Sequence, residues 1–481
     1  MNTKLNKITG LIISLFIFLN IANGQHGKPI WTNEAIGSWV DEYMGNTVKF
    51  DQFNGCVLIA RNGKVFYKRA FGLANRELNV PNKTSTRFLI GSVSKQFTAA
   101  AIMQLQEKGK LSINETIDKY IDSCPPAWKT ITIKQLLNHT SGIVNFTALE
   151  EAGGNFLMLP HSHDEILNLF KNKPLESKPG EVFNYNNAGY YLLGMIAEKV
   201  TGEKFADYVR KNLFTPMGMN DTNFDDQLTI VKDRASSYSL SDEKVFYNAY
   251  YTNMKILFSI GGTYSTVDDL LKWQQSFINQ KLLSASSINE MLQPGKGNYG
   301  YSWVIEKLGT VRRQYHDGGI LFFSASLQYL PEEQITIIAI SNSGEDGGIR
   351  VAYDIAGKIG NNPATIRAIQ PELMKLTAEQ SLSLINRYNE GFPNFDIQET
   401  KMIEVGNYLM LLKQKKQAIE VFKLNTLLYP KSAVAFLKLA MAFESDGNKE
   451  LAIKNYKNCL AIEPGNIVAN EHLVKFNKKE K

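Results

Sequence analysis

The chain has 481 residues, of which 21% are charged and 44% are apolar or aromatic, and its formal net charge at pH 7 is +6. This length exceeds that of one ordinary compact domain, so we expect a large domain followed by a smaller one. No apolar run reaches the ~20 residues that a bilayer span requires, which excludes an integral membrane bundle. The small excess of positive charge indicates no nucleic-acid partner.

The N-terminus has the layout of a signal peptide. Lys4 and Lys7 precede an apolar stretch at 11–21, and small residues follow at 22–24. This order predicts a cleaved signal peptide over residues 1–24 and a periplasmic or secreted protein. The alternative is an uncleaved membrane anchor, which is disfavoured because the apolar stretch is too short to span a bilayer. After cleavage we expect no membrane span.

The distribution of cysteine and histidine indicates no metal site. Three cysteines lie far apart in the sequence, without CxxC spacing: Cys56, Cys124 and Cys459. This spacing predicts free thiols rather than a disulfide framework or a zinc site. His161 and His163 could begin a metal site, but the partners of a hydrolytic zinc centre do not follow. We expect instead that Ser162 caps a helix beginning at His163, and we expect no metal or organic cofactor.

The expected secondary structure changes from strand to helix and back to strand. Residues 54–72 alternate apolar and polar around an Asn-Gly pair, which is typical of a β-hairpin. From Ser92 to Gly109, apolar residues recur every fourth position and predict a helix. Most segments up to about residue 260 are helical in pattern, and strands return between about 300 and 341. This order predicts an α/β sandwich whose sheet joins both ends of the domain.

A second, all-α domain is predicted at the C-terminus. Residues 361–394 form the predicted linker, and an internal repeat follows in 395–481. A shift of 34 residues superimposes small, aromatic and proline positions: Ala418 on Ala452, Phe422 on Tyr456, and Pro430 on Pro464. This pattern resembles the tetratricopeptide repeat, a helix–turn–helix unit, with a capping helix at 466–477. Two repeats rarely fold alone, so we expect them to pack on the larger domain or to bind a protein partner.

Ser92 and Lys95 are three positions apart at the start of the predicted helix, so both side chains project from one face. A serine hydroxyl is a weak nucleophile unless a base takes its proton, and a buried lysine that has lost its charge can do so. The positive end of the helix dipole also favours the developing anion. The pattern alone is common by chance, and the alternative is an exposed helix lysine beside a capping serine.

Further stretches give this pair its context. Ser92 lies in FLIGSVSKQFTAAAIMQLQEKGKL, which is followed by LLNHTSGI at 136–143, PGEVFNYNNAGYYLLGMIAEKVTG at 179–202, FTPMGMNDT at 214–222, GGTYSTVDDLLKW at 261–273 and YHDGG at 315–319. In order and spacing they resemble the class C β-lactamase, penicillin-binding-protein and related esterase family over nearly all of residues 30–345. The resemblance implies a bacterial protein with a β-lactamase-like fold in residues 26–360: an antiparallel sheet flanked by helices, plus an all-helical subdomain.

The resemblance also implies roles for the residues of the first two motifs. Ser92 would be the nucleophile and Lys95 its proton-transfer partner. Tyr185 would share the base role and return the proton to the leaving group, while Asn187 would hydrogen-bond the acyl side of the substrate. The alternative for Tyr185 is a core aromatic. His139 is expected to be structural.

The third motif is where the chain departs from the family. His316 and Gly318 match it, with Gly319 expected on an edge strand, and the backbone N–H groups of Ser92 and Gly319 would form the oxyanion hole. Lactam-hydrolysing relatives usually have lysine in place of this histidine, and threonine where this chain has Asp317. If the acid faces the cleft, it repels substrate carboxylates, so recognition of an anionic substrate is in doubt.

We therefore expect a serine hydrolase that transfers an acyl group from a small-molecule or peptide substrate to water. Esters and D-amino-acid peptides or amides are favoured over β-lactam-like substrates. The bulky residues at 320–323, where relatives often have Pro-Gly, favour apolar groups. The alternative is a penicillin-recognising or scaffold protein that binds a partner through its repeats, with vestigial hydrolysis. The intact motif residues argue against that alternative.

Overall fold

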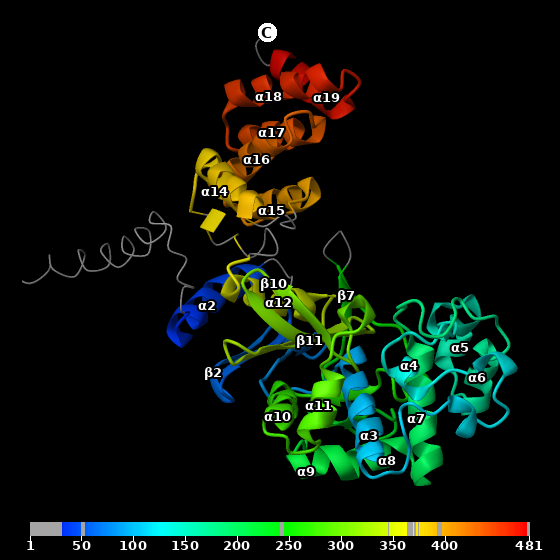
Figure 1. Ribbon diagram of the computed structural model, residues 1–481. Coiled ribbons are helices and arrows are strands. Elements are labelled where there is room, and N and C mark those ends of the chain that lie inside the picture. Colours follow the sequence, from blue (N-terminus) through cyan, green and yellow to red (C-terminus); the bar gives the residue numbers. More distant parts are fainter. Residues whose placement is uncertain are drawn as a thin grey trace, which may run out of the picture.

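The computed structural model describes residues 31–49, 53–240, 245–344, 346–362, 369, 372–373, 375–391 and 397–478. The predicted signal peptide, residues 1–24, lies outside this part of the chain. Within it, no helix combines the length and the apolar character that crossing a membrane requires. Figure 1 shows a larger α/β part and a run of helices that leads to the C-terminus.

An antiparallel sheet of six strands forms the centre of the larger part, in the order β10-β11-β12-β13-β1-β2. The strands are β1 (Gly55–Arg61), β2 (Lys64–Phe71), β10 (Val304–Leu308), β11 (Val311–Ile320), β12 (Phe323–Leu330) and β13 (Ile335–Ser341). β1 and β2 form the predicted hairpin, and both residues of its Asn-Gly turn have positive φ, as a tight turn requires. β1 also pairs with β13, so the two ends of the domain meet within the sheet, as predicted.

Each face of the sheet buries a different set of side chains. On β1, Val57 packs with α2 (Asn33–Lys49) and α12 (Gly347–Ile359), whereas Leu58 belongs to the larger core on the opposite face. Successive residues of a strand point to opposite faces. Because both faces are covered by helices, β1 is buried at nearly every position and its sequence is almost continuously apolar.

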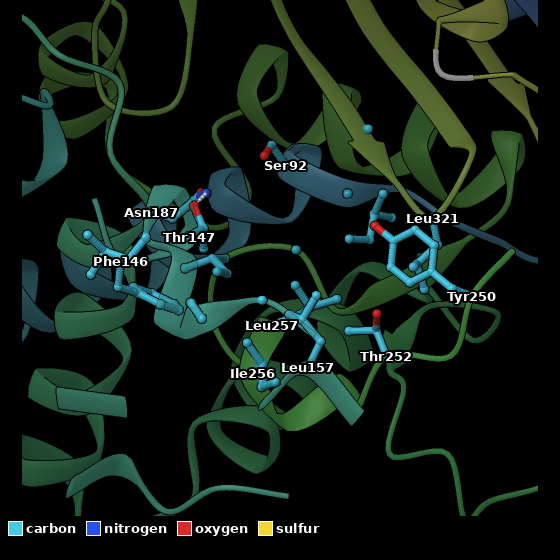
Figure 2. A pocket seen from close by; sticks show the side chains of 18 residues that line it. Ser92, Phe146, Thr147, Leu157, Asn187, Tyr250, Thr252, Ile256, Leu257 and Leu321 are labelled. Atoms are coloured by element: carbon cyan, nitrogen blue, oxygen red, sulfur yellow. Dashed lines mark hydrogen bonds between the residues drawn. The ribbon is translucent and has the colours of Figure 1, made fainter. Parts of the chain in front are cut away.

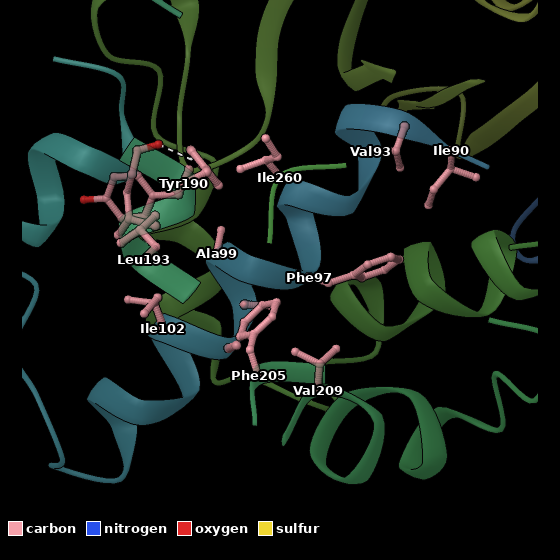
Figure 3. Packing of buried hydrophobic residues seen from close by; sticks show 14 of the residues in the cluster. Ile90, Val93, Phe97, Ala99, Ile102, Tyr190, Leu193, Phe205, Val209 and Ile260 are labelled. Carbon is pink, nitrogen blue, oxygen red and sulfur yellow. Dashed lines mark hydrogen bonds between the residues drawn. The ribbon is translucent and has the colours of Figure 1, made fainter. Parts of the chain in front are cut away.

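α3 (Lys95–Glu107) runs through the larger core and is the helix that follows Ser92. Figure 3 shows Phe97 and Ile102 of α3 among side chains from α7 (Asn187–Thr201) and α8 (Phe205–Val209). The other helices of this part are α4 (Ile133–Leu137), α5 (Asn155–Met158), α6 (His163–Phe170), α9 (Thr215–Met217), α10 (Val267–Ile278) and α11 (Ala285–Met291). Short strands complete it: β3 (Leu73–Asn75), β4 (Val80–Pro81), β5 (Phe88–Leu89), β6 (Asn223–Phe224), β7 (Tyr238–Leu240), β8 (Phe246–Asn248) and β9 (Thr263–Ser265). Ser162 caps α6, as predicted.

The C-terminal helices form a core of their own. They are α14 (Ala378–Gly391), α15 (Glu399–Leu411), α16 (Lys415–Leu428), α17 (Ala433–Ser445), α18 (Lys449–Ile462) and α19 (Ile467–Lys478). The starts of α15 and α17 are 34 residues apart, as are those of α16 and α18, which is the period of the sequence repeat. Assignment of these helix pairs to the tetratricopeptide type stays a prediction.

The predicted linker, residues 361–394, is not wholly a linker. α14 lies within it, and Ala378 and Ile385 are buried in the same core as Phe422 of α16. The helix is polar over most of its surface, but a narrow apolar stripe is enough to dock it on a neighbouring helix. The C-terminal unit therefore begins before residue 395.

Candidate active site

A close approach of two backbone segments places Ser92 against strand β11. Ser92 lies in a 3₁₀ turn, Gly91–Ser94, which leads directly into α3. Gly91 has a φ of +51°, and a Cβ added there would lie 2.8 Å from the nitrogen of Gly319. A Cβ added to Gly318 would lie 2.7 Å from the nitrogen of Ser92. Because a side chain at either position would separate the segments, the two glycines hold the turn and the strand together.

Lys95 is buried beside Ser92 and forms a hydrogen bond with it. Its Nζ donates hydrogen bonds to Ser92 Oγ at 2.9 Å and to the backbone oxygen of Ile260 at 2.7 Å. Burial holds the pKa of Lys95 well below its usual 10.5. A neutral amine at this distance can accept the serine proton.

Tyr185 lies above the same lysine. Lys95 Nζ is 5.1 Å from the centre of the Tyr185 ring. Burial raises the pKa of Tyr185 above its usual 10, and an interaction with Ser92 opposes the rise. The Tyr185 hydroxyl is buried and makes no hydrogen bond of normal geometry within the described part of the chain. The hydroxyl can therefore still accept or donate a hydrogen bond when a proton is transferred.

His139 lies below Tyr185 rather than at the nucleophile. Its Nδ1 accepts a hydrogen bond of 3.1 Å from the backbone N–H of Asn186, and its ring packs 4.4 Å from that of Tyr185. Burial lowers the pKa of His139 well below 6.5, so the ring is neutral. These contacts orient the turn between Tyr185 and Asn187, which agrees with the structural role expected for His139.

His316 is neutral, and both of its ring nitrogens are occupied. Nδ1 donates to the backbone oxygen of Asp317 at 2.7 Å, so Nε2 accepts from the hydroxyl of Tyr299 at 2.9 Å. Burial, assisted by nearby Lys95, lowers the pKa of His316 to about 3. The ring therefore offers no positive charge to a substrate carboxylate.

Asp317 does not face the cleft. Alternate residues of a strand share a face, so Asp317 points with Arg313 to the α12 side of β11, opposite to His316 and Gly318. Arg313 lies 4.4 Å above the Tyr353 ring of α12. Burial raises the pKa of Asp317 from 3.8 to about 6, and its Oδ1 has no hydrogen-bond partner among the described residues. Asp317 is therefore not placed to repel substrate carboxylates across the cleft, which was the condition of that prediction.

The N–H of Gly319 points to the side of Ser92. Ile320 and Phe323 flank a two-residue turn and pair with each other, so in the antiparallel ladder the N–H of Gly319 points away from β12. β10 pairs with β11 only as far as Tyr315. The expectation that Gly319 lies on an edge strand was therefore wrong, because β11 is the second strand of the sheet. Beyond Tyr315, however, β10 does not pair with β11, so the N–H of Gly319 has no partner strand on that side, as an oxyanion donor there would require.

Asn187 begins α7 and lines a cavity beside Ser92. Its Nδ2 donates to Thr147 Oγ1 at 2.8 Å, and its backbone N–H donates to Asn145 Oδ1 at 3.2 Å. The cavity has a volume of about 280 Å³ and is lined by Ser92, Asn187 and Gly319 together with apolar side chains. Figure 2 shows Thr147 bonded to Asn187 near Ser92, with the apolar side chains below.

The structure brings the predicted site residues close together, and three of them line the cavity: Ser92, Asn187 and Gly319. The others lie next to these or to one another: Lys95, Tyr185, His316 and Gly318. Three groups that hydrogen-bond to the site residues were not predicted from the sequence: the backbone oxygen of Ile260, the hydroxyl of Thr147 and the hydroxyl of Tyr299. None of these groups belongs to a residue within a recognisable sequence motif. In the part of the chain that is described, no three His, Cys, Asp or Glu side chains are grouped to hold a metal ion.

Known proteins match the larger part of the chain. The Beta-lactamase family profile matches residues 40–357. Penicillin-binding protein 4* of Bacillus subtilis is 30% identical over 316 residues, which is 61% of this chain and 69% of that protein. The crystal structure of a penicillin-binding protein from Bacillus halodurans is 29% identical, with a TM-score of 0.59, over 66% of this chain and 98% of that one. A D-stereospecific amidohydrolase from Streptomyces sp., 23% identical, shares the fold with a TM-score of 0.59 over 66% of this chain and 97% of its own.

The family match covers more than half of the chain and contains every residue of the cleft described above. It also agrees with the antiparallel sheet flanked by helices. The chain therefore belongs to the beta-lactamase family and is a serine hydrolase.

Proposed function

We propose that this chain hydrolyses esters and amides that have no carboxylate near the scissile bond, those of D-amino acids included, through an acyl-enzyme on Ser92. The observation that carries the proposal is the hydrogen bond of 2.9 Å between Lys95 Nζ and Ser92 Oγ, at a site where burial favours the neutral amine. A protein of the same fold is a D-stereospecific amidohydrolase, so the fold accommodates this class of substrate.

The first half of the reaction acylates the serine. Ser92 Oγ bonds to the carbonyl carbon as its proton passes to Lys95, and the carbonyl electron pair moves onto oxygen. The N–H groups of Ser92 and Gly319 stabilise this oxyanion. When the intermediate collapses, the bond to the leaving group breaks, and the proton passes through Tyr185 to the leaving oxygen or nitrogen.

The second half of the reaction releases the acid. A water oxygen bonds to the acyl carbon, and one of its protons passes through Tyr185 to Lys95. The bond to Ser92 Oγ then breaks, Oγ regains a proton, and the carboxylic acid leaves. Lys95 returns to its neutral state, so one turnover consumes one water molecule.

Because His316 is neutral, we expect substrates that have no carboxylate near the scissile bond. A penicillin or a peptide with a free C-terminus carries a negative charge, and a buried charge needs a partner. The two nitrogens of His316 are engaged with Tyr299 and the backbone of Asp317, so the ring supplies no such partner. We expect acylation by penicillins to be slow compared with acylation by neutral esters.

The proposal also places the protein outside the cytoplasm. It rests on the signal-peptide pattern of residues 1–24. N-terminal sequencing of the protein from the periplasm or medium of its bacterial host is expected to begin at Gln25. A protein partner of the C-terminal helices stays a prediction.

The test of the nucleophile is a pair of matched serine variants. Ser92→Ala is expected to abolish both hydrolysis of p-nitrophenyl acetate and covalent labelling by a fluorophosphonate. Ser94 is a buried serine two residues away, so Ser94→Ala is the control and is expected to keep both. Peptide mass spectrometry then locates the label. Labelling at another residue, or more than a few per cent of activity in Ser92→Ala, would refute the assignment.

A further inference from the structure

The cavity beside Ser92 has a lining of one chemical character. None of the residues that line its 280 Å³ carries a charge. Its walls are mostly aliphatic and aromatic, with Phe146 at one end, Leu157 and Leu257 along the floor, and Tyr250 and Leu321 at the other end (Figure 2). Such a lining stabilises an apolar group and rejects a charged one.

The position of the proton-transfer groups indicates which part of the substrate enters. The leaving group must lie beside the side chain that protonates it. Tyr185 and Lys95 do not line the cavity, whereas Asn187 and the oxyanion donors of Ser92 and Gly319 do. The cavity therefore lies on the acyl side of the scissile bond.

The wall near Tyr250 is formed by an unusual turn. Leu321 and Phe322 join β11 to β12 with φ values of 49° and 62°. A two-residue turn of this kind favours Asn-Gly, because large side chains rarely adopt positive φ. The chain nevertheless has leucine, which lines the cavity, and phenylalanine, whose ring lies edge-on to that of Tyr250 with the ring centres 6.3 Å apart. Unfavourable backbone conformations of this kind concentrate where function requires the side chain.

We propose that the cavity binds an uncharged apolar acyl group and that Leu321 and Phe322 form the end wall that sets its size. This inference rests on the proposed function and specifies its substrate class. An engineered apolar cavity of about 150 Å³ holds one benzene molecule. A volume of 280 Å³ thus suits a group about twice that size, such as an octanoyl chain or an arylalkyl group.

The first experiment varies the acyl group and keeps the leaving group constant. The p-nitrophenyl esters of acetic, pentanoic and octanoic acid are compared by kcat/KM, together with the mono-p-nitrophenyl ester of glutaric acid. The glutaryl ester has the length of the pentanoyl ester but ends in a carboxylate. We expect octanoate to exceed acetate at least tenfold, and glutarate to fall at least tenfold below pentanoate.

The second experiment changes the wall. The double variant Leu321→Asn/Phe322→Gly has the residues that the turn favours and lacks the two side chains, so it is expected to fold. The ratio of kcat/KM for octanoate to that for acetate is expected to fall at least fivefold. Val65 on the distant strand β2 is a half-exposed apolar residue, and Val65→Asn is expected to leave the ratio unchanged.

The outcomes separate this inference from the proposed function. A flat chain-length profile in a protein whose Ser92 is labelled by the fluorophosphonate overturns the acyl-group assignment and leaves the nucleophile in place. An unchanged ratio in the folded double variant overturns the role of the turn. Absence of labelling at Ser92 contradicts the proposed function itself.

Discussion

Replacement of Asp317 by asparagine is expected to stabilise the protein at alkaline pH but not at acidic pH. Burial raises the pKa of Asp317 from 3.8 to about 6. Between these two values the folded state binds the proton more tightly than the unfolded state, so the free energy of unfolding falls as the pH rises through this window. A difference of about two pKa units corresponds to about 3 kcal/mol, an upper limit because the side chain is partly exposed.

Asparagine carries no charge and keeps the shape of the side chain. We expect Asp317→Asn to raise the free energy of unfolding by about 1 to 3 kcal/mol at pH 8 and to change it by less than about 0.5 kcal/mol at pH 3.5. Urea unfolding can be followed by tryptophan fluorescence, because all five tryptophans lie in the larger domain: Trp31, Trp39, Trp128, Trp273 and Trp303.

The control is Asp268→Asn, which removes a half-exposed carboxylate paired with Lys68 and is expected to change stability by less than about 1 kcal/mol at either pH. An equal effect of Asp317→Asn at pH 3.5 and pH 8 would refute the explanation by burial. The same variant is expected to leave the ratio of kcat/KM for anionic and neutral esters unchanged, since Asp317 lies on the face of β11 away from the cleft. A changed ratio would mean that the carboxylate acts across the strand.

Three further predictions concern the cleft and the domain boundary. The kcat/KM of the wild type for p-nitrophenyl acetate is expected to rise with pH as Lys95 loses its proton at its lowered pKa. Arginine stays protonated, so Lys95→Arg is expected to lower kcat at least 10²-fold at every pH of the profile. Gly318→Ala is expected to lower kcat about 10²- to 10³-fold because its Cβ would push β11 from the oxyanion site, whereas Gly45→Ala, where nothing lies within 4 Å, is the kinetic control. Deletion of residues 363–481 is expected to leave kcat/KM within about twofold, because none of the described residues of that segment lines the cavity. A soluble, folded but inactive product would contradict this.

The sequence predicted those parts of the fold and site that depend on local pattern. The β1–β2 hairpin follows from alternation around an Asn-Gly pair, and the cap of α6 follows from Ser162 with Glu165 three residues later. Ser92 and Lys95 meet because three positions along a helix return to the same face. Each of these involves only neighbours along the chain.

The contacts that could not be predicted join distant segments. The hydroxyl of Tyr299 and the carbonyl of Ile260 reach the site through loops that have no motif. The orientation of Asp317 is a different case. The third motif was expected on a strand, and adjacent residues of a strand face opposite ways, so His316 and Asp317 point to opposite faces. What the sequence left open was which face carries Asp317, because the charged and polar residues of VRRQYHDGG lack the apolar alternation that identifies the buried face.

The pairing of β1 with β13 has a consequence for biosynthesis. β1 ends at Arg61, and β13 begins at Ile335, about 270 residues later. At the usual rate of about 5 to 20 residues per second, the β1–β2 hairpin waits roughly 15 to 55 s before its partner strand is made. During this time the apolar edge of β1 is unpaired, a condition that favours association with other chains. We expect nascent chains that stop before residue 335 to aggregate unless chaperones or a secretion factor hold them. The C-terminal helices contact mainly their neighbours in sequence, so they can fold as soon as they emerge.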